Sequence, residues 1–547
     1  MIEPFVQSPP VLENLYTSDQ LLVGFLRRKL PPEILAAIEA ECRVLGAEAA
    51  GPLASLQQAD RRNEPVLTQW DAWGNRVDRI ELSPLLREAE RRSAHYGLTA
   101  IPYERREAEW SRLRQFVLVY LFHPVTDLYT CPLAMTDGAA RALIDSGNHR
   151  LTERAVPHLT SRDPTQSWTS GQWMTESTGG SDVGRSATAA TLSVDGSWSL
   201  HGKKWFTSAA TSQMALTLAR PVGNASGGQG LAMFYVECRD QAGHLNGIRV
   251  ERLKDKLGTR KVPTAELLLE GTRAELVAGT TGGTRAIEPM LRITRTWNSV
   301  CAASIMRHAQ RLAADYARRR TAFGAPLAAL PLHRETLADM QAECAAAFLL
   351  TFWLVELLGR AEAGVATDED SLLLQLLTPL TKLTTGKQAV YVVSEAIEAF
   401  GGAGYLEDTG LPVMLRDAQV LPIWEGTTNV LSLDLLLRAD VVRGVPALER
   451  RVRTAADASR GAGLGELGET ALEAISAAHR WLQSNQDPET RQAGARRFAL
   501  TLGRATQLAL LAEHAAALPP GPGRAAVAEF ARRFRRCGID LLNEVRT

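Results

Sequence analysis

The sequence predicts a mainly α-helical protein with an inserted β domain. Helical periodicity fills the first 170 residues, and alternating strand patterns replace it from residue 171 to about 283. Long helical segments return from residue 287. Beyond residue 440 the composition changes again. We therefore expect four domains: a helical domain over 1–170, a β domain over 171–285, a helical bundle over 286–440 and a basic helical domain over 441–547.

Composition limits the classes of function. Of 547 residues, 45% are apolar and 22% charged, with 61 basic and 61 acidic side chains. This balance excludes a chain that binds polyanions over its whole surface. Six scattered cysteines without a CxxC pair indicate reduced thiols and no zinc site. We expect a cytoplasmic protein without a signal peptide or membrane span, because no basic and apolar leader is seen and the apolar run 348–358 is short.

Each domain has its own pattern. Prolines at 31 and 32 precede a helical run, but the first domain shows no cluster of chemically active residues. Alternation around Asp195-Gly196 predicts a hairpin, followed by strands. We place these strands over 214–219, 231–237, 247–252 and 265–269. The segments 294–319, 332–363, 371–400 and 429–439 are expected to form an antiparallel four-helix bundle.

The last domain contains 16 Arg, 11 Asp plus Glu and no Lys. Its densest cluster comprises Arg532, Arg533, Arg535 and Arg536. Such a cluster can neutralise the phosphates of duplex DNA. An Ala- and Arg-rich chain can equally place Arg on solvated helix faces. The charge pattern leaves both interpretations open, and we expect a separate helical appendage here.

Two stretches near the β domain combine small, hydroxyl and aromatic residues. Residues 172–182 (QWMTESTGGSD) allow a ligand to approach the backbone closely, while hydroxyl and N–H groups can bond the edge of a heterocycle. Residues 202–208 (GKKWFTS) place an aromatic beside a hydroxyl near a strand end, which could stack on a ring and bond its edge. Each stretch alone also fits an ordinary Gly-Ser turn or a buried Trp-Phe pair.

Three further stretches lie in the bundle. Residues 320–324 (RTAFG) supply a guanidinium that could hold a pyrophosphate or simply cap a helix. Residues 398–405 (EAFGGAGY) leave glycine N–H groups free for phosphate oxygens. Residues 421–429 (LPIWEGTTN) place Glu425 among apolar neighbours. A carboxylate that loses part of its hydration is suited to act as a base near neutral pH, although a Glu-Gly pair is usually a solvated turn.

Taken together and in this order, the five stretches resemble the acyl-CoA dehydrogenase family. The resemblance implies a helical domain, a β domain and a helical bundle, with FAD between the last two. It also implies that Glu425 is the base that removes the α proton of an acyl thioester. Residues implied to contact FAD are Met174, Thr175, Gly180, Ser181, Val183, Trp205, Phe206, Thr207, Arg320, Phe323, Glu398, Gly401, Gly402, Trp424, Thr427 and Asn429.

More specific roles follow from the same resemblance. Trp205 would stack on the flavin and Thr207 would bond its N5 edge. Arg320, Gly401 and Gly402 would hold the pyrophosphate or adenosine end of a neighbouring subunit's cofactor. The substrate would be contacted by Ser181, Arg295 and Gly426.

Two features depart from an ordinary member. Arg292 stands where the family carries an Asp that helps build the acyl-CoA site, and a helical domain follows residue 440. With the wording of residues 252–258 (RLKDKLG), these features are similar to the alkylation-response (AidB-type) flavoprotein branch. That branch implies a homotetramer with weak dehydrogenase activity that binds double-stranded DNA through its C-terminal domain. Genuine dehydrogenation of an unusual or bulky acyl-CoA, and an FAD-carrying scaffold for a protein or fatty acyl ligand, remain the alternatives.

Overall fold

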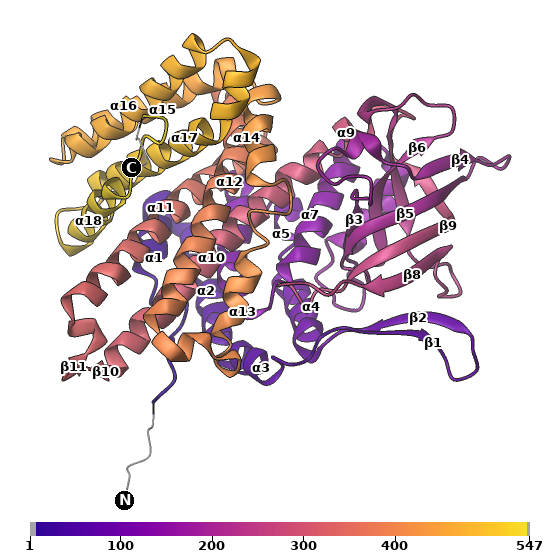
Figure 1. Ribbon diagram of the computed structural model, residues 1–547, viewed down its shortest axis with the longest axis horizontal. Helices are drawn as coiled ribbons and strands as arrows, with labels where there is room; N and C mark the ends of the chain where they lie inside the picture. Colours follow the sequence, from indigo (N-terminus) through magenta and orange to yellow (C-terminus); the bar gives the residue numbers. More distant parts are fainter. Residues whose placement is uncertain (1–6, 544–547) are drawn as a thin grey trace, which may run out of the picture. The chain divides into compact units, whose positions relative to one another are not determined.

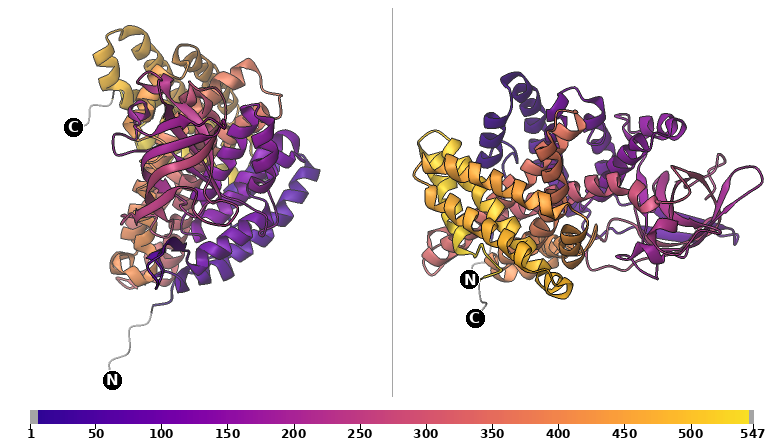
Figure 2. Two further views of the ribbon diagram at one scale, coloured as in Figure 1. Left: turned by 90° about the vertical axis from the view of Figure 1, so that its right-hand side faces the viewer. Right: turned by 90° about the horizontal axis from the view of Figure 1, so that it is seen from above.

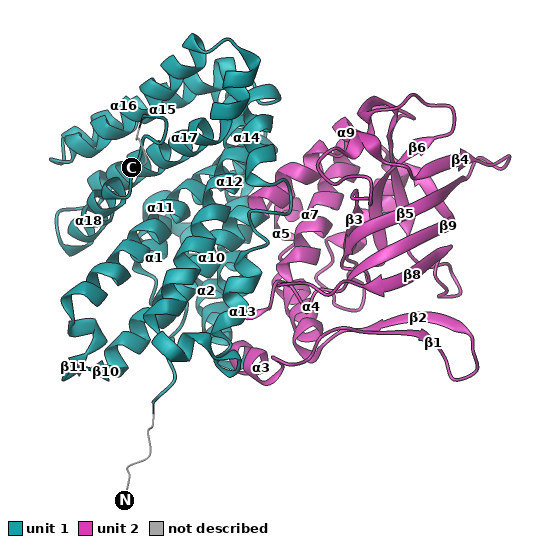
Figure 3. Ribbon diagram, in the orientation of Figure 1, with its two compact units in different colours: residues 1–52, 107–124, 298–547 teal, residues 53–106, 125–297 magenta. Residues whose placement is uncertain are grey.

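The computed structural model describes residues 7–543, and Figure 1 shows the course of the chain. By contacts, the chain forms two compact units, which are coloured separately in Figure 3. The first comprises residues 1–52, 107–124 and 298–547, and the second comprises 53–106 and 125–297. The helices predicted for the first domain are therefore shared between the units. The four predicted boundaries stay a prediction.

The second unit is built around a seven-stranded sheet. Strands β6, β4, β5, β9 and β7 pair in that order, and a further pairing of β6 with β7 closes the ring, so this part is a small barrel. β3 adds parallel to β6, and β8 adds antiparallel to β9. The strands are β3 (Ser170–Trp173), β4 (Ala189–Leu192), β5 (Trp198–Ser208), β6 (Met214–Pro221), β7 (Ala232–Glu237), β8 (Ile248–Leu253) and β9 (Thr264–Leu276).

The predicted hairpin and the predicted strands are confirmed. β4 and β5 pair antiparallel around the turn at Asp195-Gly196, where Gly196 adopts a φ of +79° that favours glycine. A second hairpin, β1 (Val66–Trp70) with β2 (Arg76–Glu81), was not predicted. The helices of this unit are α3 (Ala54–Ala59), α4 (Pro84–Tyr96), α5 (Ile101–Glu104), α7 (Thr130–Asp145), α8 (His149–Leu159), α9 (Gly283–Ala286) and the first turns of α10 (Glu288–Arg319).

The first unit contains the predicted bundle. Its long helices are α10, α11 (Pro331–Glu362) and α12 (Asp368–Ala399), joined by α14 (Thr428–Leu437). α12 begins at a capping box, in which Thr367 and Asp370 satisfy each other's backbone N–H groups. By length and composition, α11 could cross a membrane. However, 89% of its most apolar segment is buried inside the structure, as is usual for the core helix of a folded domain. The unit also contains α1 (Gln20–Lys29), α2 (Pro32–Glu48), α6 (Ser111–Phe122), α13 (Leu411–Ala418) and a short hairpin, β10 (Thr321–Ala322) with β11 (Ala325–Pro326).

The C-terminal helices are not the separate appendage that the sequence predicts. Figure 2 shows them gathered beside the bundle in orange to yellow. Gly503 of α17 lies so close to α12 that a Cβ would stand 2.2 Å from the Thr384 hydroxyl. Buried Gln507 and Gln388 exchange hydrogen bonds of 2.8 and 3.2 Å between the same two helices. The helices are α15 (Val441–Arg460), α16 (Gly465–Ser484), α17 (Pro488–Ala517) and α18 (Pro522–Arg536).

Candidate functional site

The loop after β3 exposes small residues, as the sequence predicts. Gly180 and Ser181 lie open to solvent, while Met174, Thr175 and Val183 are half-buried. The backbone of this loop is tied to the barrel, because the N–H of Trp205 donates to the Thr175 carbonyl at 2.9 Å. Because its backbone is already held in place, the loop can offer backbone N–H groups and a hydroxyl to a planar ligand without first changing conformation.

A buried ion pair lies beneath this loop and was not predicted. Glu176 accepts from Lys204 Nζ at 2.7 Å, from the Thr188 hydroxyl at 2.6 Å and from the Ala187 N–H at 2.6 Å. Lys204 is fully buried and also donates to the Leu218 carbonyl at 2.7 Å. Burial alone would raise the pKa of Glu176, but the Lys204 ammonium and these hydrogen bonds hold it below its ordinary value. The pair fixes the loop to β5.

The end of β5 departs from regular strand pairing. β5 carries a bulge between Lys204 and Thr207, where Trp205 and Phe206 oppose the single residue Glu266 on β9. The bulge turns Thr207 into the core, where its hydroxyl is fully buried and donates to the Ala265 carbonyl at 2.6 Å. The hydroxyl proton of Thr207 is therefore used within the barrel, and its expected contact with the flavin edge stays a prediction. The exposed ring and the partly exposed hydroxyl at this point belong to Phe206 and Ser208. Ser208 is not among the residues predicted to contact FAD, because alternation alone does not reveal a bulge.

Trp205 lies under a cluster of cations. Lys254 Nζ is 3.3 Å from the centroid of the Trp205 ring, a cation–π contact. The Glu266 carboxylate forms ion pairs with Lys254, Lys203 and Arg252, at nitrogen–oxygen distances of 2.7, 3.0 and 2.7 Å. Burial would raise the pKa of Glu266, but hydrogen bonds from these three groups hold it at about 2. With three cations on one carboxylate, this corner of the barrel carries excess positive charge, which suits an anionic ligand.

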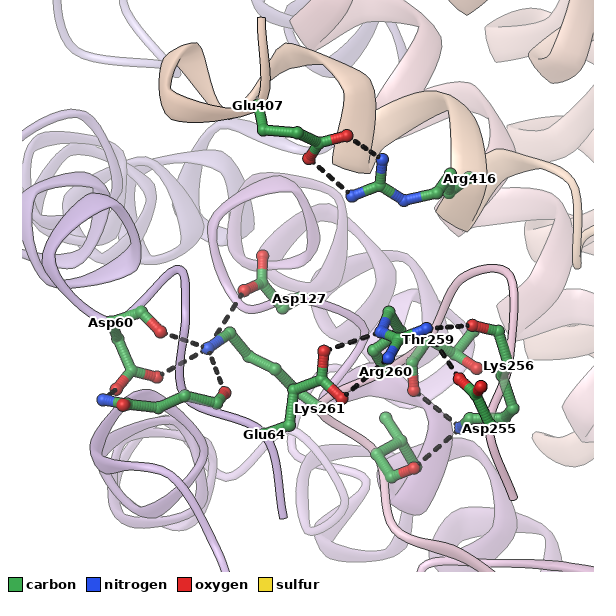
Figure 4. Close-up of polar contacts among 12 residues, drawn as sticks. Asp60, Glu64, Asp127, Asp255, Lys256, Thr259, Arg260, Lys261, Glu407 and Arg416 are labelled. Carbon is green, nitrogen blue, oxygen red and sulfur yellow. Dashed lines mark hydrogen bonds and ion pairs between the residues drawn. The ribbon is translucent and has the colours of Figure 1, made fainter. Parts of the chain in front are cut away.

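The neighbouring loop 255–261, which overlaps the stretch 252–258, has a structural role. Lys261 Nζ donates to Asp60 Oδ2 at 2.9 Å and to the Asn63 carbonyl at 2.7 Å, and Lys256 donates to the Thr259 carbonyl at 2.7 Å (Figure 4). Arg260 pairs with Glu64 at 2.6 Å. These contacts hold residues 255–261 against the segment after α3, so their charges are used within the chain.

In the first unit, the Glu425 loop connects α13 to α14. Glu425 is half-buried, so its enclosure by apolar neighbours is only partial. Trp424 packs on the bundle core, and its indole N–H donates to Asn298 Oδ1. Thr427 caps α14, where its hydroxyl accepts from the Val430 N–H at 3.4 Å. Gly426 follows the carboxylate directly. Asn429 is exposed and accepts from Arg496 of α17 at 3.2 Å.

The predicted pyrophosphate residues gather at one end of the bundle. Tyr316, one turn before Arg320, packs against Phe400 with ring centroids 4.5 Å apart and an angle of 33° between the ring planes. The ends of α10 and α12 therefore lie together and bring Arg320 near Gly401 and Gly402, both exposed. Phe323 in the β10–β11 turn is 96% exposed, and Glu398 is also exposed. Gly401 has a φ of +60°, a left-handed conformation that favours glycine directly after the C-cap of α12.

The remaining predicted contacts are less organised. Arg292 lies on α10 and is 3.5 Å from Glu288, one turn earlier. Arg295 lies on the same helix, in the second unit.

Of the four C-terminal arginines, Arg533 contacts Glu335 at 2.9 Å and Asp339 at 3.1 Å. Arg532 contacts Glu529 at 3.5 Å, Arg535 contacts Glu466, and Arg536 is exposed. This cluster is therefore largely neutralised by the chain itself.

Comparisons with known proteins agree with this arrangement. Residues 171–272 match the middle domain and residues 281–439 the C-terminal domain of acyl-CoA dehydrogenases. Residues 7–164 match the N-terminal domain of the adaptive response protein AidB. Acyl-CoA dehydrogenase family member 11 of Caenorhabditis elegans is 45% identical over 441 residues, which cover 79% of this chain and 72% of that protein. The chain belongs to the acyl-CoA dehydrogenase family.

Two further likenesses support the placement of this family member. The putative acyl-CoA dehydrogenase AidB of Escherichia coli (strain K12) is 32% identical over 438 residues, 77% of each chain. The crystal structure of C. elegans ACDH-11 in complex with C11-CoA superposes with a TM-score of 0.93 at 39% identity, covering 100% of this chain and 94% of that one.

The family is FAD-dependent, and FAD is the cofactor. The exposed Gly180-Ser181 loop, the Phe206 ring and the excess of cations near Trp205 suit a flavin with an anionic tail.

Proposed function

We propose that this protein is an acyl-CoA dehydrogenase that oxidises the α,β bond of a saturated acyl-CoA, with Glu425 as the base. The resemblance of sequence and fold to ACDH-11, whose structure contains C11-CoA, favours genuine dehydrogenation over a vestigial activity. The observation that carries the proposal is the Glu425 loop, in which a half-buried carboxylate stands on a backbone fixed to two bundle helices.

The chemistry divides between the chain and its cofactor. Glu425 removes the proton from the α carbon of the thioester, and FAD, when bound, supplies the acceptor for the hydride of the β carbon. The α proton of a thioester is weakly acidic, so hydrogen bonds to the thioester carbonyl must stabilise the developing enolate charge. A base of this kind contributes on the order of 10²–10⁴ in rate.

The same geometry supports an oligomer. Lys382 donates to the carbonyl of Gly426, beside the base, and α12 runs from there to Ala399, roughly 26 Å at 1.5 Å per residue. The Arg320 and Gly401-Gly402 group lies at that far end. The Arg320 guanidinium is therefore too far from Glu425 to contact the part of FAD that lies beside the base. Arg320, Gly401 and Gly402 are better placed to bind the cofactor of a neighbouring subunit. We include in the proposal a homotetramer assembled as a dimer of dimers.

Binding of duplex DNA is not part of the proposal. Three of the four arginines expected to contact phosphates have carboxylate partners within the described part of the chain. Breaking those ion pairs would offset the gain from each phosphate contact.

The test is anaerobic reduction of the bound flavin. Purified FAD-loaded protein is mixed with saturated acyl-CoAs of increasing chain length, including C11-CoA, and loss of the visible flavin absorbance is followed. We expect rapid bleaching with at least one chain length. Glu425→Gln should retain FAD and lose roughly 10²–10⁴ of the rate. Glu407→Gln, which removes a surface carboxylate that pairs with Arg416 (Figure 4), is the matched control.

Two outcomes would contradict the proposal. One is wild-type protein that retains its colour with every acyl-CoA, and the other is an unchanged rate in Glu425→Gln. The oligomer is tested separately by light scattering. A monomer that holds FAD tightly, or full FAD occupancy after Arg320→Ala, would refute the assignment of Arg320 to a neighbour's cofactor.

A further inference from the structure

The backbone around the base adopts a conformation that needs support. Glu425 has a φ of +58° and Gly426 a φ of +104°. Glycine enters this left-handed region freely, but a glutamate does so at an energetic cost and has no short polar side chain to bond its own backbone. Such a conformation persists only where the surrounding structure imposes it. The groups that impose it therefore also decide where the Glu425 carboxylate is presented.

Lys382 is the charged group among the contacts that hold this loop. It lies in the middle of α12, its side chain is fully buried, and its Nζ donates to the Gly426 carbonyl at 2.6 Å. Burying an ammonium is costly unless it is well hydrogen-bonded, and an apolar residue would suffice for packing at this position. The acceptor is the carbonyl of the residue directly after the base. The ammonium thus fixes the peptide plane between residues 426 and 427.

Two neutral contacts hold the start of the same loop. Asn298 of α10 accepts from the Trp424 indole and donates to the Leu421 carbonyl at 3.2 Å. Gly386, one turn after Lys382, lies against Leu421, where a Cβ would stand 3.0 Å from the carbonyl oxygen. With residues 421 and 424 fixed on one side and the carbonyl of residue 426 on the other, Glu425 lies between the fixed points and takes up part of the change of direction.

We propose that Lys382 is a positioning residue for the base. Its hydrogen bond to the Gly426 carbonyl keeps Glu425 in the left-handed conformation that presents the carboxylate to the substrate. This inference rests on the proposed function of Glu425. Without the ammonium, residue 425 can relax to an ordinary conformation, and rotation about φ displaces its side chain. A displacement of about 1 Å at a reacting group can cost on the order of 10² in rate.

The experiment compares three variants with the wild type. Lys382→Met keeps the length and burial of the side chain but removes the donor. We expect a fall of about 10- to 100-fold in the rate of flavin reduction, with FAD content and KM for acyl-CoA little changed. Lys382→Gln keeps a donor on a shorter chain and should restore part of the rate. Lys29→Met is the matched control, because it removes a half-buried ammonium that pairs with Glu356 at 2.7 Å in the same unit. That control should lose stability but not rate.

A crystal structure of Lys382→Met separates this inference from the proposed function. The expected result is a φ at residue 425 outside the left-handed region. If wild-type protein is not reduced by any acyl-CoA, the proposed function fails, and this structure still decides whether Lys382 positions the loop. The inference would be overturned if Glu425 of Lys382→Met keeps a left-handed φ, or if Lys382→Met reduces its flavin at the wild-type rate. If Lys382→Met does not fold, the same two readouts are taken on Lys382→Gln, whose shorter side chain holds the Gly426 carbonyl less firmly and should give a rate below that of the wild type with unchanged KM.

Discussion

Glu176→Gln should destabilise the barrel and release FAD. In the wild type, Lys204 is fully buried and has two strong acceptors, Glu176 at 2.7 Å and the Leu218 carbonyl at 2.7 Å. Replacing the carboxylate by an amide leaves the ammonium buried without a counter-charge. Removing one partner of a buried pair typically costs about 3–5 kcal/mol. The amide oxygen can still accept from Thr188, so we expect a loss near 3 kcal/mol.

The assay is urea denaturation followed by circular dichroism and by release of FAD. Glu270→Gln is the control in the same barrel, because Glu270 pairs with Arg249 at 3.2 Å on the surface, with 49% of its side chain exposed. Exposed pairs of this kind contribute about 0.2–1 kcal/mol. Replacing both buried partners, as in Glu176→Leu with Lys204→Met, should cost less than the single change, since no charge is left unpaired. Equal losses in Glu176→Gln and Glu270→Gln would refute the reasoning.

The pH dependence gives a second check on the same pair. The pKa of Glu176 in the folded protein lies below its ordinary value of 4.5, because Lys204 outweighs the effect of burial. A depressed pKa contributes stability that is complete above the unfolded value and is lost as pH falls through the folded value. The stability difference between wild type and Glu176→Gln should therefore be constant from neutral pH down to about 5 and narrow below about 4.5. A difference that widens on acidification would contradict this sign.

Three further predictions concern other parts of the chain. Ser208→Ala should weaken FAD retention, whereas Thr207→Val should cost about 1 kcal/mol of stability and leave FAD affinity unchanged. FAD titration measures both affinities, and a loss of affinity in Thr207→Val but not in Ser208→Ala would support Thr207 as the flavin ligand. A chain that ends at Arg443 should aggregate or lose FAD, because removing α17 uncovers the bundle; a soluble, yellow truncated protein on gel filtration would contradict this. Burial lowers the pKa of His123 and of His514 to about 3, so stability should fall as pH drops from 6.5 towards 3, and His514→Gln should flatten that slope of the urea midpoint. An unchanged slope would count against it.

Local patterns in the sequence were sufficient for the elements and their order. Apolar spacing predicted the ends of the four bundle helices to within three residues, except that α10 begins six residues earlier than predicted. The prediction works because a helix that buries one face repeats every 3.6 residues. The Asp195-Gly196 dipeptide predicted the β4–β5 turn, because few other pairs tolerate its backbone. The order of five short stretches was enough to indicate the family and its FAD cofactor, whereas the role of Glu425 stays a prediction. These inferences depend on neighbours in the chain or on the sequence of motifs, and both can be read directly.

Only the tertiary structure decided which way side chains face and which distant groups they contact. The bulge that turns Thr207 inward depends on the pairing of β5 with β9, which alternation does not encode. Lys204 and Lys382 resemble surface lysines in the sequence, yet each is buried against an acceptor 28 or 44 residues away. The tail looked separate and basic, but its arginines find carboxylates on other helices. Hydrogen bonds and ion pairs between such distant positions depend on how the whole chain packs, and a linear pattern does not record that packing.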